Sequence, residues 1–394
     1  MTRKDFLKHT ATAGIGIPFL AALFGSCNQK AALFEDFNPN FDGKVIIVGA
    51  GAAGLTAGFI LKQQNIDFEI LEAAPIYGGR VKKSDDLAEF PIDLGGEWIH
   101  TNPKVLARLL SAATDVNASV DTITYNPQTI SVWKNGELKK RNIASNFYSE
   151  WKFKNTTWYD FFDQYMVPDI KDNIVLSTAV NAINYTDEKV ILSTNQGISY
   201  EADKVLVTVP ISILKDEYID FQPALPADKI DALATVDFPE IIKIFIKFKE
   251  RFYPDLVALN NVNSDDLIYD AAFGKGSSDH VLGLFSIGDL AQKYAGMDTE
   301  AEIMTDYMAL LDEIFDGKAS EHFETSVIQH WTKEPFIRGS YSHYTEGYNS
   351  TIRTLLEPLD NKVYFAGEAL NEGGDTSTVH GASESAYKVL RNML

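Results

Sequence analysis

The chain has 394 residues, with 55 acidic and 35 basic side chains that give a formal net charge of −20 at pH 7. This excess of acid argues against nucleic acid as a partner, because nucleic-acid binding needs basic surface. A single cysteine rules out a disulfide within the chain, and the 7 scattered histidines show no ligand spacing, so no metal site is predicted. The length allows about two domains and a large core.

Residues 1–26 have the features of an export signal. Arg3 and Lys4 resemble the start of a twin-arginine signal, and the uncharged run that follows is too short to span a bilayer comfortably. The small residues before Cys27 resemble a lipoprotein box. We therefore expect an exported protein on the periplasmic side or in the cell envelope, lipid-anchored at Cys27, with 27–41 as a tether. The alternative is a cleaved signal and a cysteine without a lipid.

A glycine-rich turn joins an apolar strand to a helix within residues 44–72. Gly49 permits the tight turn, Gly51 lets backbone approach a pyrophosphate, and Gly54 lets helix and strand pack closely. The helix N-terminus offers free N–H groups and a positive dipole end to phosphates. The second strand ends in Glu72, close to the spacing expected for an acid that binds a ribose diol. Together these features predict a dinucleotide-binding βαβ unit.

Further glycine-rich segments indicate which dinucleotide is bound. Gly-Gly-Arg at 78–80 and Asp-Leu-Gly-Gly-Glu-Trp-Ile-His at 93–100 follow the βαβ unit, and 363–368 and 378–382 lie near the C-terminus. A nicotinamide dehydrogenase has no need of the second glycine cluster. Together with the first turn, these segments resemble the FAD-dependent amine oxidase family, of the monoamine and polyamine oxidase type. The resemblance runs from about residue 42 to the C-terminus.

The resemblance implies a set of contacts to FAD. Segments 78–80 and 93–98 would lie against the isoalloxazine ring, Glu368 would hold the ribityl chain, and Val180 with strand 205–210 would flank the adenine. The residues expected to bind the cofactor are Gly49, Gly51, Ala53, Gly54, Glu72, Gly79, Arg80, Gly95, Gly96, Glu97, Trp98, Val180, Gly367, Glu368, Thr378 and Val379. Because the one cysteine is assigned to the anchor, we expect FAD to be bound non-covalently.

The remaining segments complete an α/β prediction with two domains. We expect a helix over 103–113, short strands over 174–209, an alternating strand over 240–248, an amphipathic helix over 299–315, a strand over 327–331 and a last helix over 381–393 that hydroxyl groups of 376–378 cap. The domains expected are a discontinuous Rossmann-like FAD-binding domain, 42–100, 174–239 and 355–394, and an α+β substrate domain, 101–173 and 240–354.

Three residues are candidates for catalysis. Lys243, in the alternating strand, resembles the family lysine that holds a water at flavin N5, where a cation and water would assist oxygen reduction. The alternative is that Lys243 and Lys247 mark a solvated strand face. His100 resembles the histidine in the Trp-Ile-His segment of animal-type polyamine oxidases, or is a hydrogen-bonded loop residue. Tyr341 matches one wall of an aromatic substrate cage, or is a core aromatic.

The chain departs from the family at two places. Family members usually carry a long helical insertion over the substrate cavity, whereas only 105–172 is available here and much of it has the pattern of strands and turns. We therefore expect the helical part of the substrate domain to be reduced. The aromatic residue that often precedes the final glycine segment is replaced by Thr378. Loss of that second wall of the cage leaves the substrate class open, because two walls grip an amine by cation–π contact.

Charged residues favour amines over amino acids. An amino-acid oxidase would need an arginine for the substrate carboxylate, and the segment after Gly96 has none, although Arg338 or Arg80 could be proposed. Glu97 pairs either with a distal ammonium or, in the interpretation we prefer, with a surface base.

The resemblance implies an oxidase. A neutral mono- or polyamine would give the hydride of its α C–H to flavin N5, the imine would leave and hydrolyse, and O2 would reoxidise the flavin with release of H2O2. The alternatives are an L-amino-acid oxidase, an FAD dehydrogenase or desaturase that does not use O2, and a flavoprotein without turnover. We expect membrane contact only through a lipidated N-terminus, and the sequence makes no prediction of oligomeric state.

Overall fold

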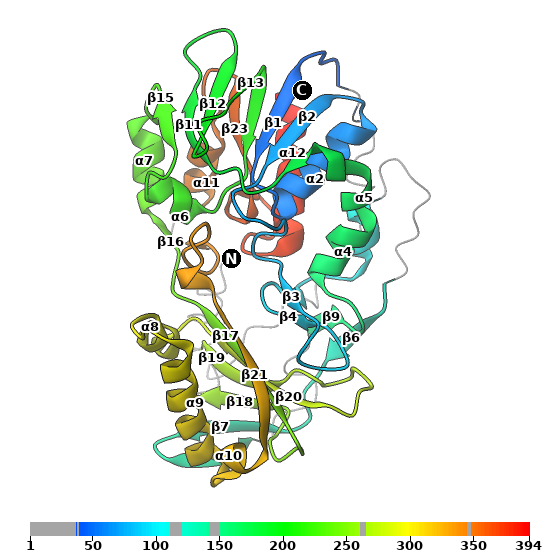
Figure 1. The fold of residues 1–394 in the computed structure, drawn as a ribbon, viewed down its shortest axis with the longest axis vertical. Helices are drawn as coiled ribbons and strands as arrows, with labels where there is room; N and C mark the ends of the chain where they lie inside the picture. Colours follow the sequence, from blue (N-terminus) through cyan, green and yellow to red (C-terminus); the bar gives the residue numbers. More distant parts are fainter. Residues whose placement is uncertain (1–36, 38, 111–119, 142–149, 261–264, 345–347) are drawn as a thin grey trace.

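The computed structural model describes residues 37, 39–110, 120–141, 150–260, 265–344 and 348–394. The predicted signal peptide, Cys27 and most of the predicted tether lie outside these residues. The described chain forms two lobes, one above the other in Figure 1. No helix in the described ranges is long and apolar enough to cross a membrane.

A parallel sheet forms the centre of the upper lobe. Its strand order is β10-β2-β1-β14-β23, and the strands are β1 (Lys44–Val48), β2 (Asp67–Leu71), β10 (Ile174–Val175), β14 (Lys204–Val207) and β23 (Val363–Phe365). Helices α2 (Ala52–Gln63) and α12 (Val379–Met393) pack together on one face. The predicted βαβ unit and the Rossmann-like fold class are confirmed.

Alternation along β1 explains why the upper lobe has layers. Val45 and Ile47 pack in the core that contains α2 and α12, whereas Ile46 and Val48 pack in a second core on the opposite face. That second core holds a four-stranded sheet of order β13-β12-β11-β15. Its strands are β11 (Val180–Asn184), β12 (Val190–Thr194), β13 (Ser199–Ala202) and β15 (Asp220–Gln222), with helices α6 (Ile211–Lys215), α7 (Ala227–Ala234) and α11 (Tyr348–Leu356) beside them.

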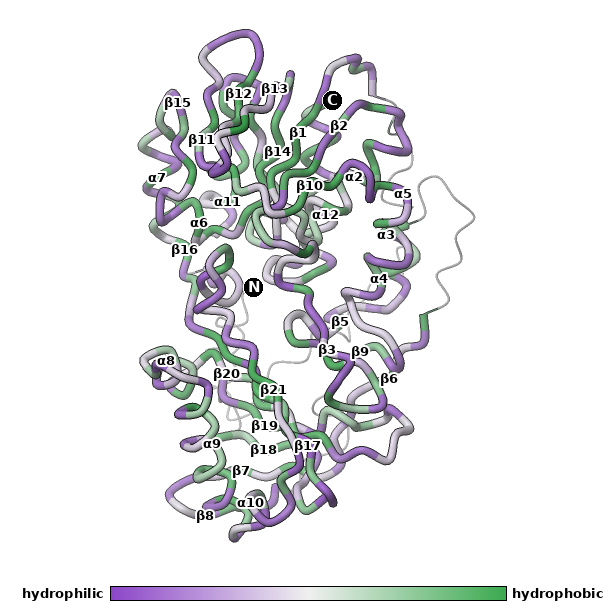
Figure 2. The backbone as a smooth tube through the Cα atoms, in the orientation of Figure 1, coloured by the Kyte–Doolittle hydropathy of each residue, from purple (hydrophilic) through white to green (hydrophobic). Residues whose placement is uncertain are grey.

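A seven-stranded sheet forms the lower lobe, in the order β21-β17-β20-β19-β18-β7-β8. Its strands are β7 (Ile130–Lys134), β8 (Glu137–Arg141), β17 (Ile242–Phe248), β18 (Leu256–Leu259), β19 (Asp266–Asp270), β20 (His280–Ser286) and β21 (Phe323–His330). Helices α8 (Asp289–Ala295), α9 (Glu300–Phe315) and α10 (Lys318–His322) flank it. Figure 2 shows hydrophobic residues along β1 in the upper lobe and around β17, β19 and β20 in the lower.

The predicted alternation of β17 is confirmed. Ile242, Ile244 and Ile246 pack in the core that includes residues of α8 and α9, and Phe245 packs in a different core with residues of β18 and β19. Lys243 shares the face of Phe245, because side chains two residues apart in a strand point the same way. The lysine is therefore directed away from the α9 core.

Residues 101–173, predicted to belong to the substrate domain, divide between the lobes. Helices α3 (Lys104–Leu110), α4 (Trp158–Tyr165) and α5 (Val167–Ile170) pack in the core of α2 and α12. By contrast, β7 and β8 join the lower sheet, and β5 (Trp98–Ile99), β6 (Thr122–Tyr125) and β9 (Glu150–Phe153) form a three-stranded sheet of order β5-β9-β6. Between 105 and 172 the described chain is thus a mixture of short strands and helices.

The predicted span of α9 and the predicted hydroxyl cap of α12 are confirmed. Thr299 and Glu302 form a reciprocal capping box at the start of α9. Thr378 accepts a hydrogen bond from the Gly381 N–H, so α12 starts at Val379, two residues before the predicted start. Strand β21 starts at Phe323, earlier than predicted, and at Trp331 the chain enters the short 3₁₀ helix η3 (Trp331–Lys333). The remaining short elements are β3 (Lys83–Ser84), β4 (Ile92–Asp93), β16 (Val236–Asp237), β22 (His343–Tyr344), η2 (Lys171–Asn173) and η4 (Glu368–Leu370).

Candidate functional site

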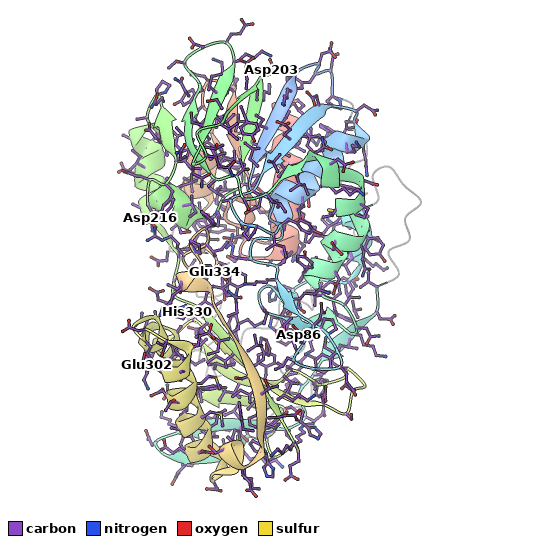
Figure 3. The ribbon with its side chains drawn as sticks, viewed as in Figure 1. Asp86, Asp203, Asp216, Glu302, His330 and Glu334 are labelled. Carbon is purple, nitrogen blue, oxygen red and sulfur yellow. The ribbon has the colours of Figure 1, made fainter. Side chains whose placement is uncertain are left out.

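A cavity of about 2230 Å³ runs from the glycine turn of the upper lobe to the β17 face of the lower lobe. This volume exceeds the roughly 300–1,000 Å³ of pockets for drug-sized ligands, so a dinucleotide and a small substrate can share it. Its wall includes Gly49 and Glu72 at one end and Lys243 and Tyr341 at the other. Glu334, labelled between the lobes in Figure 3, also lines it.

The cavity brings the predicted site residues together. Every residue predicted to bind the cofactor lines it except Gly54, and so do Lys243, His100 and Tyr341. Gly54 has a packing position instead, because a Cβ added there would lie 1.9 Å from the carbonyl oxygen of Gly49. This matches the close helix–strand contact for which the glycine was predicted. The individual roles of these residues in binding or catalysis stay predictions.

The upper end of the cavity has the chemistry of a nucleotide site. Gly49 has φ +104°, which a side chain would strain, and the first turn of α2 starts at Gly51 without a side-chain cap in the described chain. Its first N–H groups are therefore available to phosphate oxygens. Glu72 accepts hydrogen bonds from the N–H groups of Ala50 (2.6 Å) and Ala74 (2.8 Å). Burial of the Glu72 carboxyl raises its pKa.

The middle of the cavity leaves room for a flat cofactor against backbone. A Cβ added to Gly367, which has φ +153°, would meet no atom within 4 Å, so the space beside this residue is open. Arg80 donates to Glu368 Oε1 at 2.9 Å and to the carbonyl oxygen of Ser340 at 2.9 Å. Ser342 Oγ donates to Glu368 Oε2 at 2.7 Å. Segments far apart in sequence are thereby fixed around that space, and these residues fit FAD.

Helix α12 begins at the wall of the same cavity. Thr378 and Val379 line it, and Thr378 Oγ1 accepts from the Gly381 N–H at 3.0 Å. The positive end of the α12 dipole therefore faces the cavity and favours negative charge on a group bound there. Thr378 serves as the helix cap at the position where the family often has an aromatic wall.

Lys243 is buried, so the alternative of a solvated strand face is wrong for this residue. The residue is 1% exposed. The ammonium donates to the carbonyl oxygens of Asp93 (2.8 Å) and Gly95 (3.2 Å) and to Glu97 Oε2 (2.9 Å). A lysine ammonium has three N–H donors, and all three have protein acceptors here. A water held by Lys243 must therefore share or replace one of these bonds.

Glu97 pairs with buried bases, so the preferred interpretation of a surface base is wrong. Its carboxylate lies 2.9 Å from Lys243 Nζ and 3.6 Å from Lys152 Nζ, and the hydroxyl of Tyr269 donates to it at 2.5 Å. Burial opposes ionisation of Glu97, but the charges of Lys243 and Lys152 outweigh it and lower its pKa to about 2. One carboxylate thus joins two buried ammonium groups at the cavity wall.

Lys152 comes from β9 and lies among aromatic rings. It is 1% exposed and donates to the carbonyl oxygen of Ala271 at 3.2 Å. Its Nζ lies 5.4 Å from the ring centroid of Trp98 and 5.1 Å from that of Tyr125. Trp98 faces Lys152 across the β5–β9 pair. Burial lowers the pKa of Lys152, against the effect of Glu97.

His100 and Tyr341 each have an aromatic or ionic neighbour at the wall. Nδ1 of His100 lies 3.0 Å from Glu150 Oε1, and the Glu150 side chain is 3% exposed. Tyr341 stacks on His343, with ring centroids 4.9 Å apart and an interplanar angle of 30°. Both His100 and Tyr341 line the cavity.

Comparison with known families identifies the chain. Residues 159–394 match the model for flavin-containing amine oxidoreductases, and residues 47–113 match that for an NAD(P)-binding Rossmann-like domain. The first match covers more than half of the chain. The protein belongs to the flavin-containing amine oxidoreductase family.

Relatives and solved structures agree with this membership. Polyamine oxidase 1 of Zea mays is 22% identical over 481 residues, covering 95% of this chain and 94% of the relative. Polyamine oxidase 7 of Oryza sativa subsp. japonica is 22% identical, with 86% and 92% covered. A redesigned putrescine oxidase superposes with a TM-score of 0.74 at 15% identity, and cyclohexylamine oxidase from Brevibacterium oxydans with 0.73 at 16%, each covering 90% of this chain and 99% of the other. At such identities the structures show a shared fold.

Four residues at or next to the wall of this amine oxidoreductase were not predicted from the sequence. Tyr125, Glu150 and Tyr269 line the cavity, and Lys152 does not line it but contacts the lining residue Glu97. They lie on short strands without a motif, and they meet the predicted residues only in space. Strand β9 pairs with β5 and β6, whereas β19 lies in the seven-stranded sheet that contains β17. The one local signal is the Glu-Trp-Lys-Phe alternation of β9, which gave no indication of which face was buried.

Proposed function

We propose that the protein oxidises amines with non-covalently bound FAD and uses O2 as the electron acceptor. The observation that carries the proposal is one cavity that joins a nucleotide site at the α2 N-terminus to an apolar wall containing Lys243. FAD bound there would accept the hydride of the amine α C–H, and O2 would then take the electrons to give H2O2, while the imine hydrolyses.

The residues of the chain supply position and electrostatics. The first turn of α2 and Glu72 would hold the pyrophosphate and ribose, and the Arg80–Glu368 pair would fix the segments around the middle of the cofactor. Lys243 keeps a fixed positive charge at the wall, because Glu97 and two carbonyl groups hold it in place. A charge held in place in this way stabilises negative charge that develops during the reaction, and it does so most strongly where water is excluded.

The substrate end of the cavity is apolar. Ile241, Leu256, Leu267 and Phe285 line it next to Lys243. An amine enters such a surface more easily in its neutral form, since burial of an unpaired ammonium costs free energy. The neutral form is also the one that can lose a hydride from its α carbon.

The test is a panel of amines and L-amino acids with the purified FAD-loaded protein. We expect an amine to bleach the flavin without O2 and to release H2O2 when air is admitted. Bleaching only by L-amino acids would favour the amino-acid oxidase, and bleaching by an amine with slow recovery in air would favour a dehydrogenase. A flavin that stays oxidised with the whole panel would refute the proposal.

The mode of cofactor binding is tested separately. Acid precipitation should release the flavin into the supernatant, because no cysteine other than Cys27 is available for a thioether link. Flavin that stays on the precipitated polypeptide would contradict non-covalent binding while leaving amine oxidation intact.

A further inference from the structure

The acidic side chains around the cavity already have basic partners within the protein. Apart from Glu72 at the nucleotide end, every acid that lines the described wall has a basic partner. Five of these acids form ion pairs with a Lys or Arg. Glu150 and Asp375 each contact a His, which carries a charge only when it is protonated. Beyond the nucleotide end, therefore, no carboxylate of the described wall is left without a basic partner to meet a second positive charge on a substrate.

Lys152 does not line the cavity itself, but it contacts three lining residues of the kinds that would receive a substrate ammonium. Carboxylates and the faces of aromatic rings are the groups that bind ammonium ions. Glu97, Trp98 and Tyr125 bring both kinds together at the wall, and the Lys152 ammonium lies 3.6, 5.4 and 5.1 Å from them. Lys152 thus makes with the protein the contacts that a distal amino group would otherwise make.

The other side of Glu97 is also taken. Lys243 lies 2.9 Å from the second carboxylate oxygen, so a substrate cation that approached Glu97 would meet two fixed positive charges. Like charges at such distances in a buried site repel by several kcal/mol before screening. The wall that remains accessible there is apolar, with Ile241, Leu267 and Phe285.

We propose that Lys152 determines specificity by taking the place of a second substrate ammonium, so that the enzyme accepts primary monoamines with an apolar side chain and discriminates against diamines and polyamines. The inference rests on the proposed amine oxidase function and narrows its substrate class. The preference for monoamines is inferred from the residues of this chain and not from the names of the related polyamine and putrescine oxidases.

The first measurement needs no variant. Hexylamine and the six-carbon diamine of equal length are mixed without O2 with the FAD-loaded enzyme, and the rate of flavin bleaching is followed at rising concentration. We expect the monoamine to have at least about tenfold higher efficiency, which corresponds to about 1.4 kcal/mol of transition-state binding. Equal efficiency or a preference for the diamine would overturn the inference.

The second measurement removes the internal cation. Lys152→Met removes the protein's own cation from one oxygen of Glu97 and from the faces of both rings, so the ratio of monoamine to diamine efficiency should fall at least about tenfold. Lys152→Arg keeps the charge and should keep the preference for the monoamine. Lys275→Met is the matched control, since Lys275 is also a buried lysine that donates to a carbonyl, that of Phe153, and forms no ion pair with Glu97.

The outcomes separate this inference from the proposed function. Flavin that no amine bleaches means that the proposed function has failed. If both amines bleach the flavin and the diamine has the higher efficiency, the proposed function stands and only the role of Lys152 is wrong. Loss of that preference for the diamine in Glu150→Gln would then show that Glu150 binds the second ammonium of the diamine. A Lys152→Met enzyme that folds with an unchanged ratio also overturns the inference, and if the variants fail to fold, the wild-type ratio decides.

Discussion

At the scale of single residues, the Lys243–Glu97 ion pair is the best-defined feature of the site. The two residues are 146 positions apart in the chain, and their atoms lie 2.9 Å apart in the interior. A buried charge that loses its partner costs several kcal/mol, whereas removal of both charges costs less. The pair can therefore be tested by stability as well as by kinetics.

Lys243→Met should affect both the kinetics of the flavin and the stability of the fold. We expect reoxidation of reduced flavin by O2 to slow at least about tenfold, and the free energy of unfolding to fall by about 3 kcal/mol because Glu97 loses its nearer partner. Stopped-flow reoxidation and urea unfolding measure the two effects.

The double variant Lys243→Met, Glu97→Gln serves as the control for that experiment. It should recover part of the stability, since Glu97 no longer carries a buried charge without its nearer partner and only Lys152 loses a carboxylate, but it should not recover the reoxidation rate. Equal reoxidation rates in wild type and single variant would reduce Lys243 to a structural ion pair and favour the dehydrogenase alternative.

Glu97 should also make the free energy of unfolding depend on pH in the acidic range. Its folded-state pKa of about 2 lies below the usual 4.5 of a glutamate. A depressed pKa means that the stabilisation is fully present above about 4.5 and disappears as pH falls toward about 2. Glu97→Gln should therefore be much less stable than wild type near neutral pH, by about 3 kcal/mol, and the difference should narrow at about pH 3.

The matched control for this prediction is Glu137→Gln. Glu137 also pairs with a lysine, Lys139, but both side chains are more than half exposed. Loss of this ion pair should change the free energy of unfolding little, both near neutral pH and at about pH 3, since exposed pairs contribute little to stability. A gap between wild type and Glu97→Gln that stays constant with pH would show that ionisation of Glu97 does not stabilise the fold.

At the scale of elements, local sequence patterns predicted a helix or strand wherever its packing follows the spacing of its own residues. The β1–α2–β2 unit, the alternation of β17, the span of α9 and the hydroxyl cap of α12 could all be predicted, because each depends on residues two to four positions apart. Strand β9 is different. It exposes Trp151 at 38% and buries Lys152 at 1%, the reverse of the ordinary expectation for an aromatic and a charged residue.

The inversion of β9 has its cause elsewhere in the chain. Lys152 is directed to the side where Glu97, Trp98 and Tyr125 lie, and the ion pair and ring contacts there offset its burial. None of these partners is near in sequence to Lys152. The register with β5 and β6 fixes which face is buried, and a shift of one residue would reverse it. Sequence periodicity alone does not contain that register.

The cap of α9 allows a local test of element stability. Thr299→Ala removes the hydrogen bond that the side chain accepts from the Glu302 N–H, and we expect the free energy of unfolding to fall by about 1 kcal/mol. Thermal and urea unfolding measure the loss. Thr305→Ala, on an exposed turn of the same helix, is the control and should change stability by less than about 0.5 kcal/mol. Equal effects of the two changes would show that the cap does not hold the helix end.

At the scale of the whole molecule, the family motifs predicted the nucleotide end of the cavity better than the substrate end. Glycines and acids that contact a common cofactor recur as short local patterns, and all but Gly54 of those predicted here line one cavity. The substrate end is built from β5, β6, β9, β17 and β19, whose joint geometry depends on two sheets that assemble from distant segments. This is why Lys243 could be named from the sequence and its neighbours Lys152 and Tyr269 could not.

The location of the molecule in the cell is a separate proposal, which rests on Arg3, Lys4 and Cys27. A lipid on Cys27 would anchor a folded, FAD-loaded enzyme by its N-terminus, and the acidic mature chain would have no other reason to bind an anionic membrane. Cys27→Ser should therefore move the protein from the membrane fraction to the soluble fraction, while flavin content and amine-dependent bleaching stay unchanged. Fractionation with mass spectrometry of the N-terminus measures both anchoring and cleavage. Wild-type protein found in the cytosol with residues 1–26 intact would refute export, and cleaved wild-type protein in the soluble fraction would refute the lipid alone.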